Sequence, residues 1–325
     1  MYLPSTFSTA LLLTMLSTLF WGSWANTYKG TKRYAFEHFY WDYILGVVLC
    51  SWVFALTLGS HGSAGEPFVA NLQSADASNM LHALLAGAIF NVANLLLVAA
   101  VDIAGLAVAF PIAIGIAVVE GVVLSYALQP KGSIVFLVFG MALAIVAVLF
   151  DARAYNALRA TTAATRKGIL VSVFSGVLMG AFAPFVTRAM THGHTLTPYS
   201  VAALFSIGAF LCCFAANTYL MRHPIQGAPV AFSGYWKGGA RNHLLGLLGG
   251  LVWGLGGCLN FIAAGFVGVP ISYAIGQSAP LIAAAWGVLV WREFRGARPT
   301  AWASLAGMFL CYIAAISLIA LAYDR

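Results

Sequence analysis

The feature that most constrains this chain is a series of ten apolar segments that follow one another along its length. An α-helix rises 1.5 Å per residue, so about 20 apolar residues cross the hydrocarbon core of a bilayer, which is roughly 30 Å thick. Segments of this length predict transmembrane helices. The predicted spans are residues 7–27, 40–58, 79–101, 104–128, 133–150, 168–187, 198–220, 244–266, 269–291 and 302–322.

The composition agrees with a lipid environment. Hydrophobic residues make up 62% of the chain and charged residues 8%, whereas a soluble domain carries about 25% charged residues. A chain this apolar cannot cover its surface with polar groups in water. In a bilayer the backbone hydrogen bonds must be satisfied internally, which favours helices. We therefore expect an all-α membrane protein, and we expect no nucleic-acid partner despite the excess of basic residues.

The positions of the basic residues predict the orientation. The loops after spans 1, 5, 7 and 9 hold 13 of the 16 Lys and Arg residues. The opposite side holds only Lys131, Arg188 and Arg325. Cytoplasmic loops are enriched in Lys and Arg, so both termini are predicted to lie outside a multi-pass protein of the inner (plasma) membrane.

Two short matches indicate an internal repeat. Residues 20–25 match residues 178–183 at an offset of 158, and residues 105–110 match residues 268–273 at an offset of 163. Five spans per half is an odd number, so the second half must enter the membrane from the other side. Such inverted repeats are typical of secondary transporters. The predicted domains are residues 1–150, a basic cytoplasmic connection over 151–167, and residues 168–325.

Motifs for other chemistries are absent from the sequence. It has no G-x-x-x-x-G-K-[ST] phosphate loop, no H-E-x-x-H zinc motif and no G-x-S-x-G nucleophile motif. The five cysteines lie in apolar stretches without C-x-x-C spacing, which predicts buried free thiols and no metal site. We expect a protein that is not an enzyme, that has no cofactor, and that draws energy from a proton gradient.

Glu120 is the carboxylate that the sequence places well inside a span. It lies 15 residues after Gly105, about 22 Å along span 4. Ionisable groups within spans are costly and are usually functional. Glu120 is therefore predicted to carry the coupling proton, so that Glu120→Gln loses uphill accumulation but keeps exchange; the alternative is a structural carboxylate bonded to a neighbouring helix.

Asp42, at the cytoplasmic edge of span 2, has two interpretations. It is either an interfacial acid that pairs with Lys29, Lys32 or Arg33, or a gate that latches the cytoplasmic side together with Lys29.

Amide and aromatic side chains at mid-depth are the predicted contacts of a small polar solute. Asn91 and Asn94 share a face of span 3, and Tyr273 and Gln277 share a face of span 9. The offset of 163 relates Phe90 to Trp253. The competing interpretations are that the amides join helices and that the aromatic side chains of span 1 form an interfacial belt. The predicted set is Phe90, Asn91, Asn94, Trp253, Asn260, Tyr273, Gln277, Ser278 and Trp24.

These features resemble the drug/metabolite transporter superfamily. The resemblance rests on Trp286-Gly287 and Trp291-Arg292-Glu293-Phe294 in span 9. Residues 20–27 (FWGSWANT) and Tyr40-Trp41-Asp42-Tyr43 are similar to the branch of ureide permeases and glucose/ribose-type sugar transporters. The resemblance implies ten helices in two inverted repeats. Plant ureide permeases carry a long cytosolic segment after span 5, which is short here and points to a bacterial relative.

The sequence and the resemblance together predict proton-coupled uptake of a small neutral solute by alternating access. A sugar, a ureide such as allantoin, or a nucleobase fits this prediction. The alternative is a proton-antiport exporter of drugs or metabolites on the same fold. The expected partners are the solute and the lipid bilayer, for a monomer or a homodimer.

Overall fold

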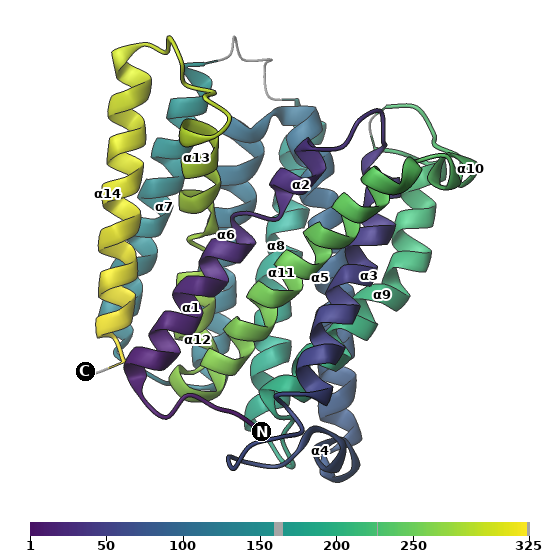
Figure 1. The fold of residues 1–325 in the computed structure, drawn as a ribbon. Helices are drawn as coiled ribbons and strands as arrows, with labels where there is room; N and C mark the ends of the chain where they lie inside the picture. Colours follow the sequence, from purple (N-terminus) through teal and green to yellow (C-terminus); the bar gives the residue numbers. More distant parts are fainter. Residues whose placement is uncertain (159–164, 226, 324–325) are drawn as a thin grey trace.

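The computed structural model describes residues 1–158, 165–225 and 227–323, without the side chains of 106 and 107. Within these residues the regular structure is entirely helical, so the all-α prediction is confirmed (Figure 1). The helices are α1 (Phe7–Trp21), α2 (Ala25–Lys29), α3 (Phe36–Leu56), α4 (Phe68–Ser74), α5 (Ala77–Ala104), α6 (Leu106–Leu128), α7 (Ile134–Asn156), α8 (Arg166–Thr191), α9 (Pro198–Arg222), α10 (Ser233–Trp236), α11 (Gly239–Val267), α12 (Val269–Gly276), α13 (Ala279–Leu289) and α14 (Pro299–Leu321).

Nine helices in the described part are long and apolar enough to cross a membrane. They correspond to nine of the ten predicted spans, with α1 and α2 counted together as residues 7–29. The remaining predicted span, 269–291, differs from expectation because it is divided into α12 and α13.

The long helices run up and down the molecule and define two ends (Figure 1). We call the end with α2 and α10 the α2 end, and the end with α4 and the N-terminus the α4 end. Helix α3 packs against α11, α5 packs against α8 and α9, and α7 packs against α14. Segments far apart in the sequence therefore form the main helix pairs.

Glycines allow two of these pairs to approach closely. A Cβ atom added to Gly250 of α11 would lie 2.8 Å from the Cα atom of Gly46 of α3. A Cβ atom added to Gly208 of α9 would lie 2.8 Å from the Cα atom of Leu84 of α5. Small residues permit such backbone contact between membrane helices.

The first span is interrupted between α1 and α2, at Gly22, Ser23 and Trp24. The Ser23 hydroxyl donates to the Leu19 carbonyl at 2.6 Å, and serine side chains that bond to the preceding turn often bend helices. The backbone N–H groups of Ser23 and Trp24 both donate to the Phe20 carbonyl. The chain thus leaves one helix and enters a second within three residues.

A second interruption, between α12 and α13, lies beside the first. Pro280 stands in the first turn of α13, where proline is tolerated because its missing N–H is not needed. The indole N–H of Trp286 donates to the Ser23 hydroxyl at 2.8 Å. A Cβ atom on Gly22 would lie 2.5 Å from the Ala279 carbonyl oxygen. The two breaks therefore meet inside the bundle.

Candidate substrate cavity

A cavity of about 410 Å³ lies where the two helix breaks meet. Its lining extends from the α2 end, at Lys29 and Asp102, to the middle of the bundle, at Trp253 of α11. Helices α5, α6, α7 and α8 contribute the remaining walls. Broken helices expose backbone groups only where they face protein or a cavity, and this location is typical of transporter binding sites.

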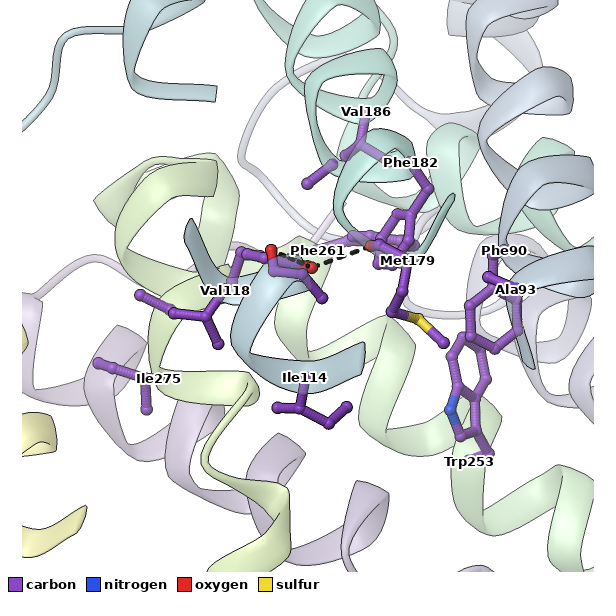
Figure 2. Packing of buried hydrophobic residues seen from close by; sticks show 14 of the residues in the cluster. Phe90, Ala93, Ile114, Val118, Met179, Phe182, Val186, Trp253, Phe261 and Ile275 are labelled. Atoms are coloured by element: carbon purple, nitrogen blue, oxygen red, sulfur yellow. Dashed lines mark hydrogen bonds between the residues drawn. The ribbon is translucent and has the colours of Figure 1, made fainter. Parts of the chain in front are cut away.

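Aromatic rings close the inner end of the cavity. The ring of Trp253 lies 4.4 Å from that of Phe90 and 5.7 Å from that of Trp21, centroid to centroid. Figure 2 shows Phe90 over Trp253, with Met179 and Phe182 beside them. Flat apolar surfaces of this kind favour stacking of a planar solute.

Three amide side chains face this aromatic lining. Asn94 of α5 is 5% exposed and donates a long hydrogen bond of 3.4 Å to the Tyr40 hydroxyl. Gln277 lies in the α12–α13 break, and Asn26 lies in α2. The Asn26 side-chain oxygen accepts from the Trp291 indole at 2.6 Å. Asn94 and Gln277 are thus placed to offer donors and acceptors to a solute.

The cavity also contains two carboxylates that the sequence analysis missed. Asp102 lies exposed at the mouth, and Asp151 lines the wall with only 4% of its surface exposed. The predicted spans ended at residues 101 and 150, whereas α5 continues to Ala104 and α7 to Asn156. The four-residue spacing of Asp151 and Tyr155, which share a helix face, was the available signal.

An ion pair at the mouth of the cavity connects α2 with the segment after α13. Lys29 of α2 contacts Glu293 at 2.6 Å, and the Tyr155 hydroxyl donates to the same carboxylate at 3.1 Å. The Lys29 ammonium also lies 5.2 Å from the centre of the Trp291 ring. The pair is exposed, so it contributes at most about 1 kcal/mol to stability. Such a weak contact is suited to a connection that opens and closes.

Trp24, Phe90, Asn94, Trp253 and Gln277 of the predicted set line the cavity, and so does Lys29, which was predicted as a gating residue. Other predicted contacts lie outside its lining. Asn260 donates to the Ser272 carbonyl at 3.0 Å, and Tyr273 donates to the carbonyls of Ala117 and Met179. These bonds tie helices together. Asn91 and Ser278 are fully buried, and their side-chain polar atoms have no hydrogen-bond partner among the described residues.

Glu120 also lies outside the cavity lining. Its side chain packs against α8, where a Cβ atom on Gly180 would lie 3.1 Å from Oε2. It is partly exposed.

Asp42 is at the centre of a polar cluster at the α2 end. It accepts from Tyr235 at 2.7 Å and from Tyr34 at 3.1 Å, and the His243 ring contacts it at 2.8 Å. The predicted pairing of Asp42 with a lysine or arginine is therefore wrong. The tyrosines and the histidine reach the buried carboxylate without the cost of burying a second permanent charge.

The tyrosines of this cluster predict alkaline sensitivity. Burial, followed by the Asp42 carboxylate, raises the pKa of Tyr34 and Tyr235 above the ordinary value of 10.0. The folded protein therefore keeps these protons when the unfolded chain has lost them. The stabilisation is full below about pH 10 and declines as the pH rises further. We expect the thermal midpoint of the wild type to fall more steeply above pH 10 than that of Tyr235→Phe; equal slopes would contradict this.

Comparisons with known proteins agree with this architecture. The family model described as Ureide permease matches residues 149–322. Ureide permease 1 of Arabidopsis thaliana is 24% identical over 387 residues, with 98% of each chain covered. Ureide permease 5 of the same plant is 27% identical over 164 residues, which cover 47% of this chain and 38% of the relative.

The fold is also found among solved crystal structures, as one example shows. This structure aligns with 97% of this chain and 99% of its own chain at a TM-score of 0.66, with 13% sequence identity. The family match covers more than half of the chain and includes all of α8 to α14. This multi-pass membrane protein belongs to the ureide permease family.

Proposed function

We propose that this protein is a secondary active transporter that takes up a small neutral polar solute with protons by alternating access. The observation that carries the proposal is the cavity at the two helix breaks, which has aromatic rings at its inner end and amide side chains around them. The cavity extends from the α2 end only to mid-depth, which is the arrangement expected of a binding cavity that is open to one side of the membrane.

Structural correspondences between the halves support two inverted repeats and the drug/metabolite transporter assignment. Gly105 and Gly268, at opposite ends, share one backbone conformation, with φ and ψ of 76° and 156° against 90° and 152°. The contacting rings of Phe90 and Trp253 are also related by the offset of 163.

The close-packing glycines extend these correspondences. Gly87 of α5 relates to Gly250 of α11 by the same offset of 163, and Gly46 of α3 relates to Gly208 of α9 by 162. Each of the four lies against a backbone of the partner helix. The proposed halves are residues 1–150 and 168–325. The proposed connection, 151–167, is shortened by the ends of α7 and α8, and its residues 159–164 lie outside those described.

The proposed orientation places the α2 end in the cytoplasm and both termini outside. Thirteen of the 16 basic residues belong to the predicted loops after spans 1, 5, 7 and 9, and the rule for cytoplasmic loops favours this orientation. The cavity then faces the cytoplasm. Rearrangement of the Lys29–Glu293 contact and of the Asp42 cluster would accompany closure of this end in the change between states.

A ureide is the proposed solute class. Ureides contain N–H donors and carbonyl acceptors in one plane, so the amides of Asn94 and Gln277 can bond to their edges while Trp253 stacks on a face. Nucleobases have the same chemistry, and sugars offer hydroxyls without a flat face. The relatives named ureide permeases support this choice.

A thermal-shift screen against ureides, nucleobases, sugars and lipophilic cations tests the solute class. A solute at 100 times its Kd stabilises the folded state by about 2.7 kcal/mol. We expect a shift with allantoin. A shift with lipophilic cations alone would contradict uptake of a neutral solute.

The alternative function is proton-coupled export of cationic compounds. The two carboxylates in the cavity, Asp102 and Asp151, favour it because they attract cations. The direction of proton movement in liposomes separates the two functions, since protons move with the solute in uptake and against it in export.

A further inference from the structure

We infer that Asp151 is the side chain that binds the coupling proton, an inference that rests on the proposed function of proton-driven uptake. Asp151 lies in α7, five residues before its end, and contributes to the cavity lining. Only 4% of its surface is exposed. It therefore meets both requirements of a coupling group, which are contact with the solute cavity and shelter from bulk water.

No lysine, arginine or histidine among the described residues forms an ion pair with the carboxylate. Its Oδ1 atom is buried and has no hydrogen-bond partner among the described residues. The two ion pairs found in that part of the chain join Lys29 to Glu293 and His243 to Asp42. An ionised carboxylate that is buried without a partner is strongly disfavoured, and it becomes neutral by binding a proton.

Within the described ranges, the elements packed against α7 supply no ion-pair partner to Asp151. From α14, the buried Tyr312 lies within electrostatic reach of Asp151. Along α7 itself, Tyr155 donates its hydroxyl to Glu293. On α6 the titratable groups are Glu120 and Tyr126, both toward the opposite end. Asp102 and Lys29 are the other charged groups of the cavity, and Lys29 is already paired.

The location of Asp151 links the proton to the solute. A proton taken from water onto the carboxylate leaves a neutral, amide-like wall that favours a neutral solute, and its release to the cytoplasm restores the charge. Coupling is a difference in solute affinity between the two protonation states. Glu120 lies about 22 Å from Gly105 along α6, whereas Asp151 lies only about 8 Å from the same end along α7. Glu120 is also outside the cavity lining and has no such contact with the solute.

Transport by the protein reconstituted in liposomes shows whether Asp151 or Glu120 binds the coupling proton. Liposomes with a pH difference of one unit and radiolabelled allantoin support about tenfold accumulation if one proton moves per solute. We expect Asp151→Asn to equilibrate allantoin without accumulating it, while still exchanging labelled for unlabelled solute. Its exchange rate should lose the pH dependence of the wild type. Glu120→Gln should still accumulate, and Glu66→Gln, which removes a carboxylate near α4, is the matched control.

The contrary results are equally specific. Accumulation of allantoin by Asp151→Asn would overturn the assignment. So would loss of accumulation in Glu120→Gln while Asp151→Asn accumulates allantoin as the wild type does. If Asp151→Asn does not exchange solute at all, Asp151→Glu keeps the carboxyl and must accumulate allantoin; failure of this variant also overturns the assignment. Wild-type protein that transports none of the screened solutes would instead remove the proposed function, before any variant is compared.

Discussion

Replacing Gly250 with alanine is expected to lower the unfolding free energy by about 3 kcal/mol, at the upper end of the cost of overpacking a core. The added methyl group would lie 2.8 Å from the Cα atom of Gly46 and closer still to the Tyr43 carbonyl. These are backbone atoms, so no side chain can rotate away. Helices α3 and α11 would have to separate along their contact.

The matched control is the same substitution in a different environment. A Cβ atom on Gly115, in the middle of α6, would have no neighbour within 4 Å. Gly115→Ala should therefore leave the thermal midpoint unchanged or slightly raised, since alanine favours helix over glycine. The midpoint of each purified variant in detergent gives the comparison. Equal stability of the two variants would show that the α3–α11 contact is looser than described.

Replacing Asn94 with leucine is expected to weaken solute binding by about 10- to 100-fold. Loss of one partner leaves a buried polar group of the solute unsatisfied, which costs about 1–3 kcal/mol. The thermal midpoint of the protein itself should fall modestly, because the buried Tyr40 hydroxyl loses its hydrogen bond to Asn94, which is long at 3.4 Å. The Kd for allantoin, obtained by titration calorimetry, is the measurement.

Asn260 provides the comparison, because it is also an amide at mid-depth. Its side chain donates to the Ser272 carbonyl and does not line the cavity. Asn260→Leu should lower the thermal midpoint and leave the Kd of the folded protein close to the wild-type value. If Asn260→Leu weakens binding more than Asn94→Leu, the cavity is not the solute site.

The sequence did not show which of the mid-depth amides line the cavity. Helical spacing selected Asn94 and Gln277, which line the cavity, but the same argument selected Asn91 and Asn260, which do not. An amide that bonds to a solute and one that joins two helices have the same spacing and the same hydrophobic flanks. Only the neighbouring helices decide between them, and α12 brings the Ser272 carbonyl to Asn260.

The prediction of the cavity carboxylates was limited by where the predicted spans ended. Apolar windows end where the first charge appears, so Asp102 and Asp151 fell outside the predicted spans. Helices end where backbone bonding ends, which for α7 is at Asn156, more than a turn later. Hydropathy did not show the division of the span 269–291, for the opposite reason. Residues 269–291 contain no charged residue, and the average hydropathy of a window does not register the interruption at Gln277 and Ser278.

The sequence by itself determined that this is an all-helical membrane protein, and it placed nine spans to within a few residues at most ends. These properties depend on the length and hydrophobicity of each segment, which are local. The tertiary structure alone decided that two helix breaks meet, that α3 packs on α11 through glycines, and that Asp151 lines the cavity. Those properties depend on contacts between residues more than 100 positions apart, such as Ser23 and Trp286, whose approach is fixed by the packing of the whole bundle.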